Sequence, residues 1–94
     1  MRRTFPEGLE RSGGTPKFTQ DTVPDALRAS HALAAGRWGL LHVLSGTLVF
    51  VDEETGAESV ITAPAEWVIP PERRHNVRIP EAVTFRIDFY RAPA

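Results

Sequence analysis

Hydrophobic residues gather in short runs from residue 38 onward, and turn-forming residues separate these runs. The runs at 38–44 and 47–51 are separated by Ser45-Gly46, and the run at 84–90 alternates between apolar and polar residues. Alternation with a period of two is typical of a half-buried strand, and short strands at this spacing indicate an all-β sandwich or small barrel. The predicted strands are 38–44, 47–51, 58–62, 66–69, 76–79 and 84–90.

The first thirty residues do not show this pattern, because glycine and proline recur too closely there for long strands or helices. We therefore expect residues 1–30 to form an irregular arm packed across the strands, within a single domain of residues 1–94. One helical turn is predicted at 23–28, with Pro24 at its first position, where the missing N–H of proline is tolerated.

Composition narrows the class of protein. The 94 residues include no cysteine, which excludes disulfides, thiolate metal sites and cysteine nucleophiles. The net charge of −1 gives no long-range reason to expect nucleic acid or an anionic membrane as a partner. No apolar run is long enough to span a bilayer, and no apolar segment follows Met1-Arg2-Arg3. We therefore expect a cytoplasmic protein.

The segment 69–77 combines two prolines, a charged turn and a histidine. Proline fixes φ and lacks an N–H, so Pro70-Pro71 ends one strand and the polar residues that follow carry the turn. His75 then opens the next strand, which can aim the side chain inward. A side chain held by a rigid turn on a β-scaffold is suited to a metal or ligand site in a small barrel.

The chain has three histidines, His31, His42 and His75, and none pairs with another at helical metal-binding spacing. If the chain ran straight from His31 to Val43, these two residues would share one face and His42 would lie on the other. A bend at Gly36 would change that register. We expect His42 to point outward, and His31 and His75 to line one cavity. The alternative is two strand-end histidines that only bond the backbone.

Asp88 is the candidate for a third metal ligand. A carboxylate in the middle of a strand is costly to bury unless it is paired or coordinated. In the alternative, Asp88 and Arg86 share the solvent face while Phe85, Ile87 and Phe89 fill the core, and strand parity favours this second interpretation.

Other residues are weaker candidates for a pocket. Arg73 and Arg74 could attract an anion near the cavity mouth, since guanidinium groups match oxyanions, or could simply form a solvated turn. Trp38 and Trp67 could wall a small-molecule pocket or could pack in the core. The sequence has no Gly-rich phosphate loop, nucleophile elbow or catalytic acidic pair, so catalytic residues stay unknown and enzymatic activity stays open.

Two segments resemble the motifs of the cupin proteins. Residues 43–48 resemble the end of the first motif, and residues 70–77 resemble the second, Pro-x-Gly-x-x-His, with Pro70 and His75 matching. Over nearly its full length the chain is similar to the tellurite-resistance-B-like (TehB/YeaR-like) small cupins. This resemblance implies a cupin-like β-barrel, that is, a double-stranded β-helix or jelly roll. The matching segments are 6–9, 15–19, 23–24, 31, 36–39, 43–46, 70–71 with 75, and 89–90.

The chain departs from the full cupin metal site. That site has two histidines and a glutamate in the first motif, but Leu33 and Gly39 stand at the expected second-histidine and glutamate positions. Glu72 also replaces the glycine of the second motif. The resemblance therefore implies that His31 and His75 bind a divalent ion such as Zn, Ni, Fe or Mn, with water or an oxygen-donor ligand at the remaining positions.

The resemblance also implies a role in a stress response or a response to tellurite or related oxyanions, with a small molecule or oxyanion as partner. One alternative is a metal-free module that binds a small molecule in the same cavity. Another is a domain that acts as a homodimer, because exposed strand edges invite pairing.

Overall fold

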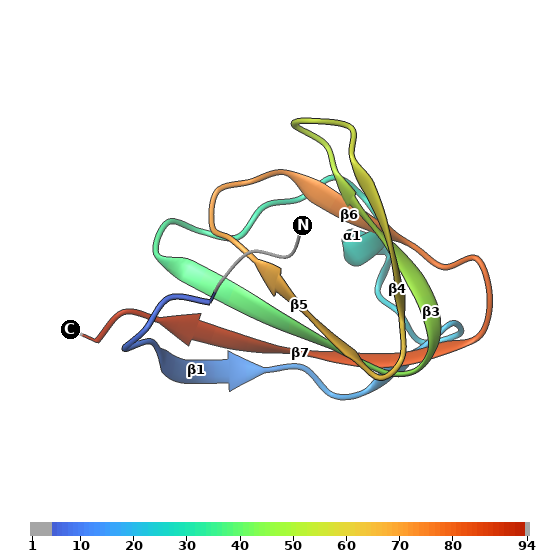
Figure 1. Ribbon diagram of the computed structural model, residues 1–94, viewed down its shortest axis with the longest axis horizontal. Helices are drawn as coiled ribbons and strands as arrows, with labels where there is room; N and C mark the ends of the chain where they lie inside the picture. The colour runs from blue at the N-terminus through green and yellow to red at the C-terminus, as the bar shows by residue number, and fades with distance from the viewer. Residues whose placement is uncertain (1–4, 94) are drawn as a thin grey trace.

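One long strand, β3 (Arg37–Asp52), runs through the whole fold in the computed structural model, which describes residues 5–93 (Figure 1). The described residues form strands and one helical turn, so the fold is all-β, as the sequence predicts. The other elements in chain order are β1 (Glu10–Gly14), β2 (Phe18–Thr19), α1 (Asp25–Arg28), β4 (Glu58–Thr62), β5 (Ala65–Ile69), β6 (His75–Arg78) and β7 (Val83–Arg91).

Two antiparallel sheets share β3. The first half of β3 pairs with β5 on one side and with β7 on the other, and β1 and β2 pair with the far edge of β7. The second half of β3 pairs with β4 and β6. Figure 1 shows that β3 bends between these halves, so the inner faces of the two sheets are turned toward each other.

The two sheets do not close into a barrel. Within residues 5–93, β5, β1 and β2 at the edges of the first sheet form no ladder with β4 or β6 at the edges of the second. The cupin-like β-barrel predicted from the resemblance is therefore not formed as a closed barrel, and the jelly roll stays a prediction. The physical reason is that, among residues 5–93, β3 is the only strand that forms ladders in both sheets, and apolar side chains pack between the two sheets.

The core lies between the inner faces of the two sheets. Alternate residues of each strand point into it, so Leu41 and Val43 of the first half of β3 meet Leu48 and Phe50 of its second half in one cluster. Burying each of these side chains stabilises the fold by roughly 1.5–3 kcal/mol. The most completely buried large side chains are Phe85, Leu41, Leu48, Val43 and Val83.

Gly46 allows β3 to continue where the sequence predicts a turn. β3 passes through Ser45 and Gly46 without a break, and its register against β7 shifts between Val43 and Ser45. Gly46 has a φ of 73°, a conformation that residues with a side chain rarely adopt. A Cβ at this position would also clash with the carbonyl oxygen of Ala82. The predicted strands 38–44 and 47–51 are therefore one bent strand.

The N-terminal arm is more regular than predicted. It contains β1 and β2, which extend the first sheet along β7, and α1 follows directly after Pro24. Residues 1–4 of the predicted arm lie outside the described residues. The other four predicted strands form with limits within one residue of those expected. No helix in the described part of the chain has the length and apolar character needed to cross a membrane.

We expect Gly46→Ala to lower the free energy of unfolding by about 2 kcal/mol or more, because the variant combines a strained φ with a backbone clash. Gly56→Ala is the matched control, since Gly56 has a φ of 78° but no atom close to the position of a Cβ. Urea denaturation of both variants separates the clash from the strain. Equal stability of the two variants would contradict the packing argument at Ala82.

Candidate functional site

His31 and His75 lie side by side. Their backbones form an isolated antiparallel bridge, in which the N–H of each residue donates to the carbonyl oxygen of the other, at 3.1 and 2.9 Å. The two ring centroids are 4.2 Å apart, with the rings edge to face at 67°. The structure therefore brings together the two residues that the sequence favours as ligands, although 44 positions separate them in the chain (75 − 31).

Backbone carbonyls fix the orientation of both rings. Nδ1 of His31 lies 3.0 Å from the carbonyl oxygen of Ala29, and Nδ1 of His75 lies 2.9 Å from that of Arg73. A carbonyl oxygen can only accept, so each Nδ1 carries a proton and donates it. Each neutral ring then has its lone pair on Nε2, which no described residue hydrogen-bonds. Metal-ligating histidines are oriented by hydrogen bonds of this kind.

His75 is buried, with 3% of its surface exposed, and its ring stacks on Phe50 with centroids 5.0 Å apart. Burial lowers the pKa of His75 below its ordinary value of 6.5, because it disfavours the charged ring, and the nearby His31 lowers it further. The hydrogen bond to the Arg73 carbonyl opposes this shift without reversing it. His75 is therefore neutral at pH 7, and its Nε2 is available as an acceptor or ligand.

Both histidines line a cavity of about 220 Å³, called here the histidine cavity. Arg37, at the start of β3, is a charged residue of this cavity that the sequence analysis missed. Its guanidinium carbon lies 4.0 Å from the centroid of the Phe89 ring. Strand parity could have identified Arg37 as a cavity residue, because it has the same inward-facing parity on β3 as Gly39 and Leu41. The apolar walls are Leu27, Leu33, Leu41, Phe50, Ile69, Val77, Ile87 and Phe89.

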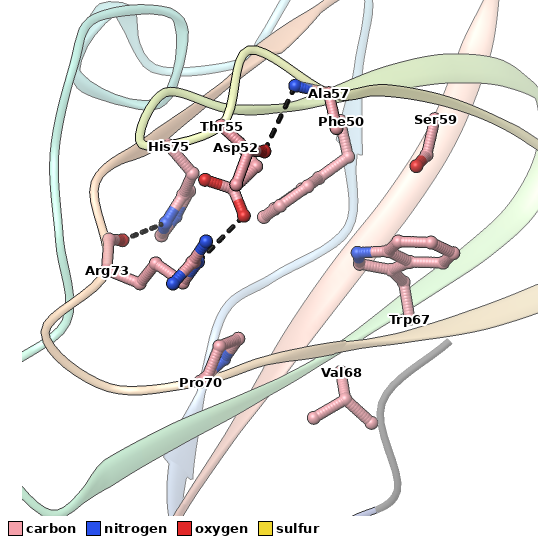
Figure 2. Close-up of a pocket in the computed structure, with 10 residues that line it drawn as sticks. All are labelled: Phe50, Asp52, Thr55, Ala57, Ser59, Trp67, Val68, Pro70, Arg73 and His75. Carbon is pink, nitrogen blue, oxygen red and sulfur yellow. Dashed lines mark hydrogen bonds and ion pairs between the residues drawn. The ribbon is translucent and has the colours of Figure 1, made fainter. Parts of the chain in front are cut away.

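A second cavity, of about 230 Å³, shares Phe50 and His75 with the first, and we call it the tryptophan cavity because Trp67 lines it (Figure 2). Trp38, the other predicted pocket residue, lines neither cavity. It packs edge-on against Phe5 with ring centroids 6.4 Å apart.

The two arginines of the charged turn are separated. Nε of Arg73 donates to Oδ2 of Asp52 at 2.7 Å, and Arg73 lines the tryptophan cavity. Arg74 instead donates to the hydroxyl of Ser30 at 2.9 Å and to its carbonyl oxygen at 3.2 Å. The structure therefore does not join the two guanidinium groups in one anion site.

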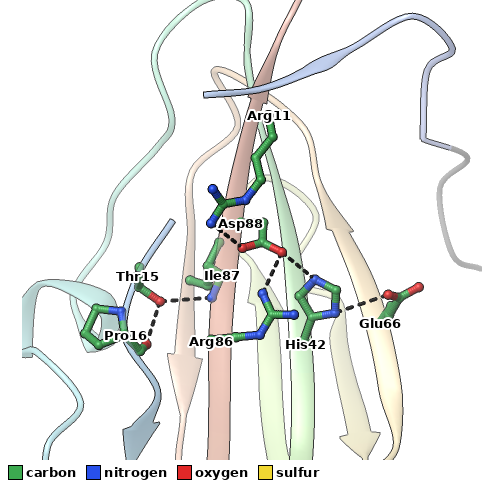
Figure 3. Close-up of polar contacts among 8 residues, drawn as sticks. All are labelled: Arg11, Thr15, Pro16, His42, Glu66, Arg86, Ile87 and Asp88. Carbon is green, nitrogen blue, oxygen red and sulfur yellow. Dashed lines mark hydrogen bonds and ion pairs between the residues drawn. The ribbon is translucent and has the colours of Figure 1, made fainter. Parts of the chain in front are cut away.

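Asp88 lies on the opposite face of the first sheet from the histidine cavity. Figure 3 shows its polar contacts. Its Oδ1 accepts from Arg11 at 3.1 Å, and its Oδ2 accepts from Arg86 at 2.6 Å and lies 3.0 Å from Nε2 of His42. Asp88 is only 7% exposed. The candidate third ligand is thus separated from His31 and His75. Residues 5–93 contain no cluster of three or more His, Cys, Asp or Glu side chains that could hold a metal ion.

His42 bridges two carboxylates on that outer face. Its Nε2 faces Asp88, and its Nδ1 lies 3.1 Å from Oε2 of Glu66 on β5. His42 points away from the core, as strand parity predicts, yet its side chain is only 14% exposed. Sequence reasoning missed this network because it depends on the pairing of β3 with both β5 and β7.

The arginines of the network determine the charge of Asp88. Burial raises the pKa of Asp88, but hydrogen bonds and charge from Arg86 and Arg11 outweigh this effect and lower the pKa below its ordinary value of 3.8. Asp88 is therefore ionised at pH 7, and its carboxylate ties β1, β3 and β7 together.

We expect Asp88→Asn to lower the free energy of unfolding by about 1.5–3 kcal/mol at pH 7, because Arg86, Arg11 and His42 lose a shared charged acceptor. Since the folded pKa of Asp88 lies below 3.8, the stabilisation is present above that pH and is lost as the pH falls through the folded value. Urea denaturation of both proteins from pH 7 to pH 3 measures the difference.

Glu81→Gln provides the control for this prediction, because Glu81 is exposed and its substitution should change stability by no more than about 0.5 kcal/mol. A stability difference between wild type and Asp88→Asn that stays constant down to pH 3 would show that the carboxylate has no special pairing.

Comparison with known proteins relates this chain to a family. A model of the TehB-like domain matches residues 14–87. A solved structure of a protein from Escherichia coli K12 is 24% identical with a TM-score of 0.90, covering 98% of this chain and 99% of that one. TehB from Haemophilus influenzae is 27% identical with a TM-score of 0.84, covering 92% of this chain but 32% of TehB. None of the curated proteins matches this chain.

Proposed function

The chain belongs to the TehB-like domain family, and we propose that it binds a divalent transition-metal ion through Nε2 of His31 and Nε2 of His75. The observation that carries the proposal is the pair of adjacent imidazoles whose Nδ1–H groups are both held by backbone carbonyls. When both rings are neutral, this arrangement leaves a lone pair on Nε2 of each of the two adjacent rings.

The surroundings of the two lone pairs favour a shared cation. The walls of the histidine cavity are mostly aliphatic and aromatic, so they offer few hydrogen-bond donors to the rings. Among the ions that the resemblance implies, imidazole ligands suit Zn, Fe and Ni better than Mn.

Two protein ligands leave the other coordination positions to water or to an oxygen-donor molecule. Arg37 lines the same cavity, and its guanidinium group is suited to pair with a small oxyanion or carboxylate that also reaches the ion. A small anion is therefore the partner we propose for the loaded site. The link to tellurite or stress stays a prediction from the resemblance.

A metal-free binding module is the second candidate, and the composition of the donor set favours it. Two imidazoles hold a divalent ion weakly, and the described residues supply no third side-chain ligand beside them. In this alternative, the two Nε2 atoms accept hydrogen bonds from a donor group of a small molecule in the histidine cavity.

Elemental analysis of protein purified without an affinity tag or chelator tests the metal proposal. We expect about one ion per wild-type chain and a loss of nearly all of it in His31→Ala and in His75→Ala, because a single imidazole is a poor site. His42→Gln is the matched control, since it removes a histidine on the opposite face, and it should keep its ion.

Two outcomes would contradict the metal proposal. One is a wild-type protein that contains no ion and whose melting temperature does not rise with added Zn²⁺, Ni²⁺ or Fe²⁺. The other is metal that remains bound in His31→Ala and His75→Ala. A small-molecule melting shift that persists in the presence of a chelator would favour the metal-free module.

A further inference from the structure

We propose that the tryptophan cavity binds a second ligand, a small, flat, uncharged molecule with a carbonyl acceptor, such as an aromatic amide (Figure 2). This cavity lies among β3, β4, β5 and the turn before β6, and His31 is not among its lining residues. The proposal therefore does not depend on whether the two histidines bind a metal.

Aromatic rings form the apolar wall of the cavity. The rings of Phe50 and Trp67 have centroids 6.1 Å apart and are inclined at 45°, and the His75 ring stacks on Phe50 at 24°. Planar aromatic walls favour a flat guest, because offset stacking and edge contacts add to the burial of its surface. The shape of the wall therefore selects a planar ring over a bulky aliphatic group.

Two polar groups in this wall form no hydrogen bond within residues 5–93. Neither the indole N–H of Trp67 nor the hydroxyl of Ser59 hydrogen-bonds to any described residue, although both side chains line the cavity. Neither atom is fully buried, so a molecule that enters the cavity can reach both. In Figure 2 the indole nitrogen faces the space between Trp67 and Arg73. A partly buried indole N–H usually has an acceptor, so these groups are available to a ligand.

Arg73 adds further donors to the same space. Its Nε is used by Asp52, and its nearest other carboxylate oxygen, Oε1 of Glu54, lies 3.9 Å from one terminal nitrogen, too far for a hydrogen bond. The oxygens of Asp52 already accept from Arg73 and from the backbone N–H of Glu54. The cavity thus has spare donors on Trp67, Ser59 and Arg73, and a ligand that supplies an acceptor would use them.

The charges around the cavity favour an uncharged acceptor over an anion. Asp52 neutralises the guanidinium of Arg73 at 2.7 Å, and the carboxylate of Glu54 adds negative charge nearby. A carboxylate ligand would lose its hydration without meeting a net positive field. A carbonyl oxygen can accept from the indole, the hydroxyl or the guanidinium without that cost.

The size of the cavity limits the ligand to about one ring. Its volume of about 230 Å³ is below the range typical of sites for drug-sized molecules. Benzamide combines the required features in one small molecule, a flat ring and an uncharged carbonyl, and serves as the probe. Benzoate keeps the flat ring but carries a negative charge and no N–H group, and cyclohexanecarboxamide keeps the amide but replaces the flat aromatic ring with an aliphatic one.

Nuclear magnetic resonance of the two indole N–H groups tests the proposal in the full chain, with a chelator present. We expect benzamide to shift the Trp67 indole signal in a saturable way and to leave the Trp38 signal in place, because Trp38 packs on Phe5 away from the cavity. The variant Trp38→Phe assigns the two signals. Benzoate and cyclohexanecarboxamide should bind at least several-fold more weakly.

Three variants separate this site from the histidine cavity. Ser59→Ala should weaken benzamide binding about two- to tenfold, the loss expected for one hydrogen bond. Trp67→Phe keeps an aromatic wall but removes the indole N–H, and should weaken binding by a similar factor, as followed by calorimetry. His31→Ala should weaken benzamide binding by less than either of these two variants does, because His31 does not line the tryptophan cavity.

The proposal would be overturned if the Trp67 signal did not shift up to the solubility limit of benzamide, or if both indole signals shifted together. Equal binding of benzoate would overturn the inference of an uncharged ligand, and equal binding of cyclohexanecarboxamide would overturn that of a flat one. Loss of benzamide binding in His31→Ala would show that the probe occupies the histidine cavity instead.

Discussion

The fold depends on the passage of β3 through Gly46 without a break. β5 pairs with β3 before this point, β7 pairs with β3 up to Gly46 itself, and β4 and β6 pair with β3 after it. If the strand ended there, the two sheets would lose their shared backbone and the core between them would lose its geometry. Only a residue without a Cβ fits the positive φ and the close approach of Ala82. One small residue thus sets the relative position of the walls that form both cavities.

The sequence predicted local structure well where side-chain alternation decides it. The limits of β4 to β7, the outward direction of His42 and the separation of Asp88 from the core side chains all follow from a period of two. It did not predict that Ser45-Gly46 continues a strand, because a glycine with positive φ is equally compatible with a turn and a bulge. The open arrangement of the sheets also depends on long-range pairing that no local pattern encodes.

The candidate site could be predicted only in part for a related reason. His75 follows a rigid proline turn, so neighbouring residues were enough to predict it as a site residue. Its bridge to His31 could not be predicted in this way, because it requires two distant segments to meet in space. The nitrogen that carries the proton in each ring depends on the backbone carbonyl of Ala29 or Arg73. Every residue has a backbone carbonyl, so the sequence does not show which one a ring contacts. The place of Arg37 in the cavity and the ion pairs of Asp88 depend on the register of β3 against β5 and β7, which the structure supplies.

Phe50 and His75 form a common wall of the two cavities. The two rings stack face to face, so a change in the position of one is transmitted directly to the other. An occupant that alters this stacking from one side alters the free energy of binding on the other side. Such linkage is reciprocal, since each occupant must change the affinity for the other by the same factor. A single stacked pair therefore gives this small domain the physical means to couple two binding events.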